Sequence, residues 1–367
     1  YSTRGAHWFL GQALHALLQQ SGLEKAQIDG LTVSSFSLAP DTAVGVTQHL
    51  GLSPRWLDHI PTGGASGVMA LRRAARAVQC GDAEVVACVA ADTNHVDSFR
   101  QTLGAFSDFA RDASYPYGAG GPNSMFAFIT DHYMRQYGAT RDDFGRIAVD
   151  QRSNALKNPN ALFKKPLSLD EYLKAKAISN PIHLFDCVMP CAGADAFLVM
   201  TEERARDLGL PHVHLRGAIE RHNAYSDDPI MVRGGWRVDR DDLYAQAGLA
   251  PKDISMLMTY DDYPVISMMQ MEDLGFCDKG EGPAFVRSHD LTFSGDFPHN
   301  TSGGQLSIGQ PGAAGGFIGL VEAMRQLTGQ AGERAVKNAR TALVGGFGMV
   351  VYDRCLCTGA VILEKSE

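Results

Sequence analysis

Basic clusters and long apolar runs are missing from this sequence. Its 367 residues include 33 Lys and Arg against 41 Asp and Glu, and the basic residues gather no further than pairs such as Arg72-Arg73 and Lys164-Lys165. A nucleic-acid-binding groove is therefore not expected, because neutralising phosphates requires a concentrated basic surface. No apolar run approaches the roughly 20 residues that span a bilayer, and no signal peptide is visible, although the chain opens at Tyr1. We expect a soluble, cytoplasmic protein.

The seven cysteines are an odd number in a long chain, which indicates a reducing compartment rather than a disulfide framework. Cys187 and Cys191 have a spacing compatible with zinc, but no second Cys/His pair lies close to them in the sequence. We therefore expect no metal, and we expect these two thiols to behave as small buried side chains. Cys355 and Cys357 lie in a run typical of a strand, which would point both side chains to one face.

What is present is an ordinary globular composition, 45% hydrophobic and 20% charged, in a chain long enough for two or three packed units. The spacing of apolar residues predicts helices over residues 8–20 and 41–50. Runs of β-forming residues predict strands over 28–36 and 84–91, and the second is almost wholly apolar, as in a parallel sheet covered on both faces. The order of these signals is a βαβ pattern.

The second half of the chain repeats the first. Residues 22–31 resemble residues 248–257: in each, a helix ends at a glycine, a short turn follows, and a strand begins with Ile and then Leu. Glycine-rich segments at 63–67 and 309–316 each open a helix. The shared order predicts a duplicated α/β domain. The glycine-rich segments lack the Gly-Lys-Ser/Thr ending of a P-loop, so they do not by themselves indicate phosphate binding.

A long insertion, about residues 94–191, contains polar helical stretches at 123–137 and 140–156. Insertions of this size usually carry function, so we expect it to form a lid over the junction of the two halves. We place the N-terminal half at residues 1–210, insertion included, and the C-terminal half at residues 211–367.

Short motifs in the insertion and in the second half resemble the thiolase superfamily, in the branch that includes the sterol-carrier-protein thiolases. They are Tyr137-Gly138-Ala139-Thr140, Leu184-Phe185-Asp186-Cys187, Gly193-Ala194-Asp195-Ala196, Leu274-Gly275-Phe276-Cys277 and Asn300-Thr301-Ser302-Gly303-Gly304. The likeness covers nearly the whole chain, lacking only a first strand that would precede Tyr1. It implies an α/β thiolase fold, in which two βαβαβαββ halves with five-stranded sheets form a five-layered α-β-α-β-α core and the insertion forms a lid.

The positions that the resemblance marks as catalytic have changed. The nucleophilic cysteine of these thiolases falls at Gly64, the histidine of their Gly-His-Pro motif at Gln310, and their late cysteine within residues 345–348, which hold only glycine and phenylalanine. Glycine supplies no nucleophile, and glutamine exchanges no proton near neutrality. The His-Asp-Cys-Phe motif corresponds here to Tyr260-Asp261-Asp262-Tyr263. Thiolase chemistry through an acyl-cysteine is therefore not expected.

A thiolase scaffold without that cysteine and histidine is similar to the thiolase-like retro-aldolases of steroid side-chain degradation, which cleave a β-hydroxyacyl-CoA into a ketone and a shorter acyl-CoA. The resemblance implies the same reaction here, on a bulky steroid, bile-acid or aromatic side chain. The coenzyme A thioester would be the substrate, and no cofactor is expected. Such a cleavage requires a base, an acid and a site that holds the enolate, but no covalent nucleophile.

The resemblance makes Tyr260 the candidate base or acid, although its ordinary pKa near 10 requires a neighbouring group to help. Those aldolases have a second tyrosine where this chain has Gln310, so the partner of Tyr260 stays open among His59, Asp261 and His299.

Other positions are candidates for holding the substrate. Backbone N–H groups at Gly63 and Gly64 could form an oxyanion hole, because a helix N-terminus favours negative charge. Gly346 is a further backbone candidate for this role. Three further candidates for substrate contact are Tyr263, Asn300 and Gly304.

Two other functions stay open from the sequence. One is an unorthodox thiolase or acyltransferase whose nucleophile is displaced to Cys187 or Cys191. The other is a non-catalytic thiolase-like subunit that stabilises an assembly, in which Tyr260 and Tyr263 would only pack at the junction of the halves.

The resemblance also implies partner proteins. Thiolases commonly pair through the edge of the first-half sheet, so we expect a homodimer with the strand at 84–91 near the contact. The members most like this chain work with a small partner that has an OB-fold and often a zinc ribbon. This predicts an α2β2 complex whose zinc belongs to the partner.

Overall fold

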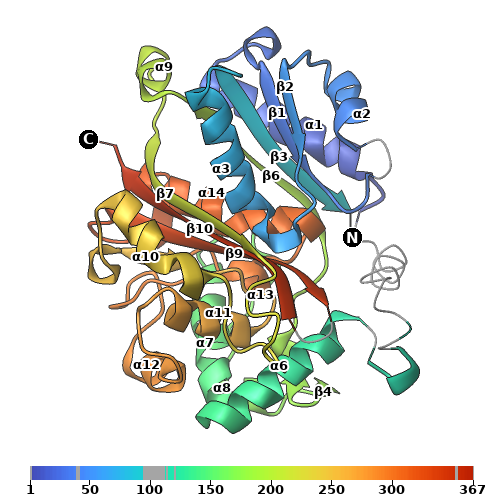
Figure 1. The fold of residues 1–367 in the computed structure, drawn as a ribbon, viewed down its shortest axis with the longest axis vertical. Helices are drawn as coiled ribbons and strands as arrows, with labels where there is room; N and C mark the ends of the chain where they lie inside the picture. The colour runs from blue at the N-terminus through green and yellow to red at the C-terminus, as the bar shows by residue number, and fades with distance from the viewer. Residues whose placement is uncertain are drawn as a thin grey trace.

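The computed structural model describes residues 2–38, 42–93, 112, 115–119, 121–351 and 354–366. Its centre consists of two four-stranded sheets (Figure 1). The first sheet has the order β2-β1-β3-β6, with the bounds β1 Gly30–Ser34, β2 Trp56–His59, β3 Val85–Thr93 and β6 Ala192–Met200. The first three strands are parallel and β6 is antiparallel to β3. The strands predicted at 28–36 and 84–91 are β1 and β3.

The second sheet has the order β7-β10-β9-β8, with the bounds β7 Val213–His222, β8 Met256–Met258, β9 Thr341–Val351 and β10 Arg354–Lys365. β8 and β9 are parallel, and β10 is antiparallel to its neighbours β7 and β9. Three strands of one sheet correspond to three strands of the other: β1 to β8, β3 to β9 and β6 to β10. Among the described strands, β2 of the first sheet and β7 of the second have no counterpart. The predicted duplication is therefore confirmed.

The prediction of five strands in each half is wrong for the described residues, where each sheet has four. In the second half, a further segment runs beside β8 but forms only one parallel bridge, between Leu257 and His299. Asn300 then takes a positive φ of 41°. Its side-chain oxygen accepts the N–H of Thr259 at 2.8 Å, where a strand would have offered a backbone carbonyl. The local turn thus replaces the strand.

Apolar faces of the two sheets determine the layers. Helices α1 (Ala6–Ser21) and α2 (Thr42–Leu50) cover the outer face of the first sheet. Helices α3 (Ser66–Gln79) and α14 (Gly315–Leu327) lie between the sheets, and α10 (Trp236–Ala247) and α11 (Pro264–Asp273) cover the outer face of the second. This is the predicted α-β-α-β-α order, and the helices predicted at 8–20 and 41–50 are α1 and α2.

The insertion packs mainly below the second sheet, as Figure 1 shows. Its described elements are α6 (Pro122–Tyr137), α7 (Arg141–Ala155), α8 (Leu169–Leu173), β4 (Ala177–Ser179) and β5 (Ile182–His183), so the helices predicted at 123–137 and 140–156 are confirmed. Next to them lie α12 (Gly282–Ser288) and α13 (Gly304–Ile308). Most of residues 94–120, which also belong to the predicted lid, lie outside the described residues.

The connection between the halves runs through α9 (Glu202–Asp207), which follows β6 and precedes β7. The boundary that we place at residues 210 and 211 falls in this connection.

β3 is not an edge strand, so the expected dimer contact near residues 84–91 is wrong as a site of strand pairing. β1 occupies one side of β3 and β6 the other. In the part of the sheet that the structure describes, β2 is the outer strand beside β1. An apolar run reveals that a strand is buried, but its neighbours are determined by long crossover connections that the run does not encode.

The two helices between the sheets meet at their glycine-rich starts. A Cβ atom at Gly67 would lie 2.1 Å from the carbonyl oxygen of Gly316, and a Cβ atom at Gly316 would lie 2.7 Å from the carbonyl oxygen of Gly64. Glycine at these positions therefore allows the two backbones to approach each other. This close approach explains the paired glycine-rich segments at 63–67 and 309–316.

A buried carboxylate joins the second of these glycine-rich segments to the first sheet. Asp92, at the end of β3, accepts hydrogen bonds from the hydroxyls of Ser35 at 2.7 Å and Ser37 at 2.6 Å. It also accepts the N–H of Ala313, in the 3-10 turn just before α14, at 2.7 Å. Burial raises the pKa of Asp92. The group therefore fixes the second-half glycine segment against the first sheet.

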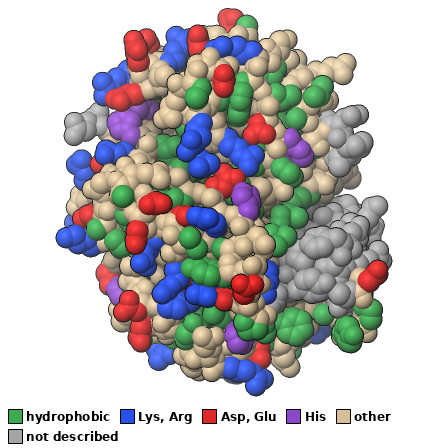
Figure 2. Space-filling model, viewed as in Figure 1, with side chains coloured by type: hydrophobic (Ala, Val, Ile, Leu, Met, Phe, Trp, Pro, Cys, Tyr) green, Lys and Arg blue, Asp and Glu red, His purple; other side chains and the backbone are tan. Residues whose placement is uncertain are grey.

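The surface carries acidic, basic and apolar side chains. On the face drawn in Figure 2, acidic and basic side chains are interspersed with apolar ones. Among the described helices, none combines the length and the apolar character needed to cross a membrane.

Replacing Gly67 by alanine should destabilise the protein strongly, because the added Cβ meets backbone rather than a flexible side chain. Overpacking typically costs about 1–3 kcal/mol, and we expect Gly67→Ala to lower the free energy of unfolding by at least about 3 kcal/mol. Urea denaturation measures this change. Gly11→Ala is the matched control: Gly11 also lies in a helix, but its Cβ would meet only one atom, at 4.0 Å. That variant should be as stable as the parent or up to about 1 kcal/mol more stable, and equal effects at both positions would contradict the prediction.

Candidate active site

The motif Tyr260-Asp261-Asp262-Tyr263 forms the turn between β8 and α11. Tyr260, Asp262 and Tyr263 line a cavity of about 160 Å³, whereas Asp261 does not. The rest of the lining comes from both halves and the insertion, and includes Gly64, Asn123, Phe126, Gln310 and Phe347. The structure thus brings together segments that are far apart in the sequence.

Tyr260 occupies the space next to Gly64. A Cβ atom at Gly64 would lie 2.0 Å from the Tyr260 ring and 2.4 Å from the carbonyl oxygen of Phe347. The Tyr260 ring is nearly parallel to the Phe347 ring, with a centroid separation of 6.2 Å and an interplanar angle of 10°. Any residue other than glycine at position 64 would therefore collide with the tyrosine. A cysteine at position 64 and the ring of Tyr260 would occupy the same space, so the chain cannot hold both.

The backbone of Tyr260 is held by Gln270 from the following helix, α11. The Gln270 side chain accepts the Tyr260 N–H at 3.2 Å and donates to the Tyr260 carbonyl at 2.8 Å. Since Gln270 is fully buried, this two-sided contact is protected from water. It orients the tyrosine ring toward the cavity.

The acid–base character of the cavity depends on Tyr260 and Asp262, which interact with each other. Burial, with the Asp262 carboxylate as a second cause, raises the pKa of Tyr260 well above 10. Burial also raises the pKa of Asp262 to about 7, with the neighbouring Asp261 as a further cause and the hydrogen bond to Tyr260 acting in the opposite direction. Near neutral pH the tyrosine is therefore a proton donor, and the carboxyl group of Asp262 is close to half ionised.

Gln310 reaches the cavity from the segment that precedes α14. Its side chain donates to the Gly312 carbonyl at 3.1 Å and accepts the Gly312 N–H at 3.1 Å. Its backbone N–H donates to the carbonyl of Met189 in the insertion at 2.8 Å. The side chain also interacts with Tyr260 and acts to lower the pKa of that phenol. Gln310 therefore holds its own amide group and the backbone of Gly312 beside the tyrosine.

Asp261 points away from the cavity, and its carboxylate forms hydrogen bonds that hold a neighbouring helix in place. Its carboxylate accepts the N–H groups of Gln305 at 3.0 Å and Leu306 at 3.2 Å in α13. A Cβ atom at Gly304 would lie 2.2 Å from one of its oxygens, and the Asn300 amide lies on the same side. Asn300 and Gly304, which we predicted to contact the substrate, lie behind Tyr260 and do not line the 160 Å³ cavity.

Three other candidates also lie away from the cavity lining: His59, His299 and Gly346. His59 lies at the end of β2. His299 is fully buried, and its Nε2 is 2.7 Å from the Thr259 hydroxyl. Burial lowers the pKa of His299 to about 3, so this ring is neutral and is not a cation that could assist Tyr260. Gly346 lies within β9 opposite Gly359 of β10, whereas Gly63 and Gly64 do line the cavity.

The insertion supplies side chains that the sequence did not single out. Asn123 in α6 accepts a hydrogen bond from the Tyr263 hydroxyl at 2.5 Å. Phe126 stacks on the Tyr263 ring with a centroid distance of 4.0 Å. Asp262 was also not among the predicted catalytic residues, although its place two residues after Tyr260 could have indicated that both face the same side. Asn123 and Phe126 carry no sequence signal of their own, because only folding brings α6 to the cavity.

The cysteines of the insertion are poor nucleophiles. Cys187 lines the cavity, and burial raises the pKa of its thiol to about 12. Burial raises the pKa of the Cys191 thiol to about 12 as well. Only the thiolate attacks an acyl group, and at neutral pH almost none is present at such a pKa. This environment does not support a displaced thiolase nucleophile.

The two matching sheets, with paired helix starts between them, define a thiolase fold. The family described as "Thiolase C-terminal domain-like" matches residues 217–362. The structure is also similar to that of a monomeric SCP2-thiolase-like protein type 1 from Mycobacterium smegmatis, with a TM-score of 0.74 over 100% of this chain and 75% of that chain. At 17% sequence identity, that likeness concerns the fold alone.

Relatives with higher sequence identity show to which group of thiolase-fold proteins the chain belongs. The chain is 33% identical to the steroid side-chain-cleaving aldolase of Thermomonospora curvata, over 87% of this chain and 84% of the relative. It is 31% identical to the 17-hydroxy-3-oxo-4-pregnene-20-carboxyl-CoA lyase of Mycobacterium tuberculosis, over 87% and 85%. A solved structure described as "Ltp2-ChsH2(DUF35) aldolase" matches with a TM-score of 0.84 at 29% identity, over 99% of this chain and 94% of that chain. The chain belongs to the thiolase-like retro-aldolases.

Introducing a cysteine at position 64 should not produce a thiolase. We expect Gly64→Cys to lower the melting temperature and to reduce lyase turnover by at least about 100-fold, because the new side chain displaces the Tyr260 ring. Thermal unfolding and steady-state kinetics measure the two effects. Cys187→Ser and Cys191→Ser serve as controls and should keep turnover within about threefold of the parent. A thiolase activity gained by Gly64→Cys, or an acyl adduct on Cys187 in the mass spectrum, would contradict this account.

Proposed function

We propose that the protein cleaves the Cα–Cβ bond of a bulky β-hydroxyacyl-CoA by a retro-aldol reaction, giving a ketone and a shorter acyl-CoA. The observation that carries the proposal is the placement of Tyr260 in the space that a nucleophilic side chain at position 64 would require, beside a carboxyl group whose pKa is about 7. This pair provides an acid and a base but no nucleophile. Retro-aldol cleavage needs these same two functions.

In this mechanism Asp262 is the base and Tyr260 is the acid. The Asp262 carboxylate takes the proton of the β-hydroxyl, the Cα–Cβ bond breaks as the ketone forms, and the electron pair passes to the thioester as an enolate. Tyr260 then donates its proton to Cα. Because the two side chains interact, the proton held by Asp262 passes to the tyrosinate and restores both groups. Each turnover leaves the protein with the protons it started with.

The enolate oxygen requires a donor in the cavity. Gly63 and Gly64 line the cavity at the start of the helical segment that leads into α3. The N-terminal end of a helix has a positive partial charge and free N–H groups, which stabilise a developing oxyanion. We assign the backbone at Gly64 to this role, with Gln310 holding the neighbouring polar groups in position.

An apolar substrate fits the rest of the lining. Phe36, Phe126, Phe347, Met349 and Val350 supply apolar surface around Tyr260 and Asp262. The volume of about 160 Å³ is below the roughly 300–1,000 Å³ of sites that enclose a whole ligand. The cavity therefore receives the reacting carbons, and the bulky ring system lies outside it. One relative is named for cleaving a steroid side chain and another for a pregnene carboxyl-CoA, and we propose a steroid acyl-CoA as the substrate class here.

Partner subunits are part of the proposal. The solved relative described as "Ltp2-ChsH2(DUF35) aldolase" combines an aldolase chain with a second protein. We propose that this chain also works with a small partner that has an OB-fold and a zinc ribbon, in an α2β2 complex whose two copies of this chain pair beside β2. Free thiols at all seven cysteines support a reducing compartment such as the cytoplasm.

Removing either proton-transfer group should lower kcat rather than raise KM. We expect Tyr260→Phe and Asp262→Asn each to reduce kcat by about 10²–10⁴-fold, the usual contribution of a general acid or base. Gln310→Ala should cost less, because an amide only positions other groups. Steady-state kinetics with a steroid β-hydroxyacyl-CoA, in the presence of the partner subunit, measures these changes. His59→Gln is the control outside the cavity and should keep kcat within about threefold. Unchanged turnover in Tyr260→Phe would contradict the proposal.

The pH dependence tests the assignment of the base. Because the Asp262 carboxyl has a pKa of about 7, it is protonated and inactive as a base below that pH. We therefore expect kcat/KM to rise with pH and to level off above about pH 7. No basic limb should appear at pH 9, since the pKa of Tyr260 is raised well above 10. Residual activity of Asp262→Asn should lack the acidic limb. A parent profile that is flat from pH 5.5 to pH 8.5 would exclude Asp262 as the base.

A further inference from the structure

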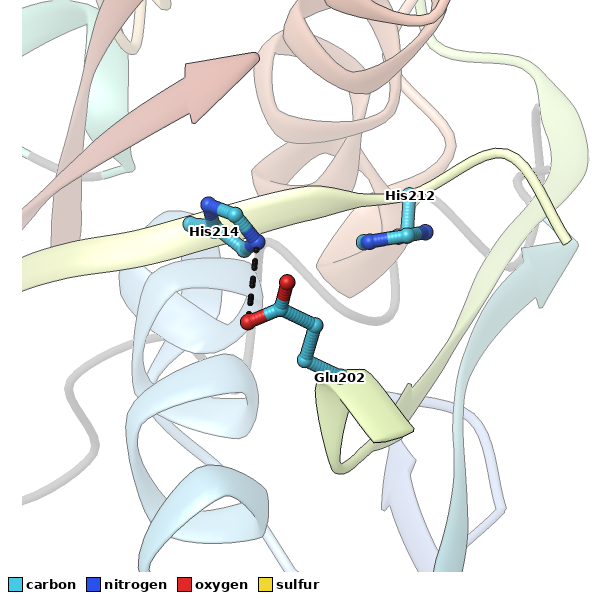
Figure 3. Close-up of side chains that lie close together, drawn as sticks. All are labelled: Glu202, His212 and His214. Carbon is cyan, nitrogen blue, oxygen red and sulfur yellow. Dashed lines mark ion pairs between the residues drawn. The ribbon is translucent and has the colours of Figure 1, made fainter. Parts of the chain in front are cut away.

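We propose that Glu202, His212 and His214 form a binding site for a divalent transition-metal ion such as zinc, outside the catalytic cavity. One potential donor atom from each of the three residues lies within 4.8 Å of the others. Figure 3 shows the carboxylate of Glu202 and the two imidazole rings directed toward one another, with the histidines coming from the β7 segment and the glutamate from α9. Two histidines and one glutamate are a donor set that zinc takes in proteins.

Local structure explains why the rings lie on the same side. His212 immediately precedes β7 and His214 lies within it, two residues further along. Successive side chains of an extended segment alternate, so residues two apart share a face. Glu202 is the first residue of α9, in the connection between β6 and β7. The chain reversal between α9 and β7 brings the carboxylate under the two rings.

The ring nitrogens that would bind the metal form no hydrogen bond with the described residues. Nε2 of His212 and Nε2 of His214 are both buried from solvent and lack a hydrogen-bond partner. The other ring nitrogen of His212, Nδ1, is 2.9 Å from the Leu210 carbonyl. An Nδ1–H donated to a backbone carbonyl leaves the Nε2 lone pair free, which is the arrangement that orients a metal-binding histidine.

The distances suit a small ion after modest side-chain movement. Two donors that are each about 2.0–2.1 Å from a tetrahedral zinc lie about 3.3 Å apart. Nε2 of His214 is 3.4 Å from Oε2 of Glu202. The other carboxylate oxygen, Oε1, pairs with Arg206 one turn further along α9, which holds the carboxylate in place while leaving Oε2 for the metal. The third donor, from His212, lies within 4.8 Å of the other two.

The surroundings leave room for a fourth ligand. The three residues belong to the lining of a groove of about 650 Å³ between the helices and the ends of β6 and β7. Three protein donors and an accessible fourth position are typical of zinc sites that hold a water molecule. A metal here would also join α9 to β7, and so fix the connection between the two halves. The site is independent of the lyase chemistry.

Zinc titration of the intact protein tests the site. We expect one equivalent of Zn²⁺ to bind with a Kd in the micromolar range or tighter, measured by calorimetry after EDTA treatment, and Co²⁺ to give the visible absorption of a four-coordinate ion. His212→Ala and His214→Ala should each weaken binding at least 10-fold. His222→Ala is the matched control, because His222 lies on the same strand at the other end, and it should bind zinc like the parent.

Stability provides a second readout. Saturating zinc should raise the melting temperature of the parent and of His222→Ala by several degrees, and should leave His214→Ala unchanged. His214→Gln, which keeps the size of the side chain, covers the case in which alanine disturbs β7; far-UV circular dichroism of the metal-free proteins verifies the fold. Absence of one-to-one binding tighter than about 100 µM, or equal binding by the parent and the His212→Ala/His214→Ala double variant, would overturn the proposal.

Discussion

The close contact between the starts of α3 and α14 is the constraint on which the rest of the molecule depends. Gly64, Gly67 and Gly316 allow two backbones to approach to distances that a Cβ atom would prevent. This contact places two helices side by side between the sheets and brings the carboxyl ends of both sets of parallel strands to one junction. The buried Asp92 holds the segment that precedes α14 against the first sheet, because it bonds Ser35 and Ala313 at once. The cavity lies at this junction.

The same contact determines the chemistry. An enzyme that kept a side chain at position 64 would have no room for Tyr260, since the ring lies 2.0 Å from where that Cβ would be. Once the tyrosine fills this space, it is buried beside Asp262, and burial moves the pKa values of both groups upward. For the phenol this movement preserves the proton to be donated. For the carboxyl group it places the pKa near the working pH, where a group can both accept and release a proton. With Gly64 in place of a nucleophile and Tyr260 in the space beside it, a thiolase scaffold thus becomes suited to proton transfer.

Much of the fold and part of the site could be predicted from the sequence. Repeated Gly-turn-Ile-Leu segments and repeated glycine-rich helix starts identified the two halves, because each is a local pattern with a local physical cause. The motif around Tyr260 identified that tyrosine as a candidate, but the sequence did not identify the side chains that accompany it in the cavity. His59, Asp261 and His299 are near Tyr260 or the glycine segment in the sequence, yet their side chains lie outside the cavity lining. Asp262 and the insertion residues Asn123 and Phe126 line it instead.

The sequence by itself determined the class of protein, the duplication, and the absence of a nucleophile at position 64, because these are properties of residue type and order. Only the tertiary structure decided which side chains share the cavity and which of them can exchange protons. Neighbouring residues in a turn face opposite sides, so Asp261 bonds α13 while Asp262 meets the substrate space. The pKa of each group then follows from burial and from charges that are distant in sequence. The pairing of β3 with β1 and β6, and the meeting of Glu202 with His212 and His214, likewise depend on crossover and reversal of the chain, which local patterns do not specify.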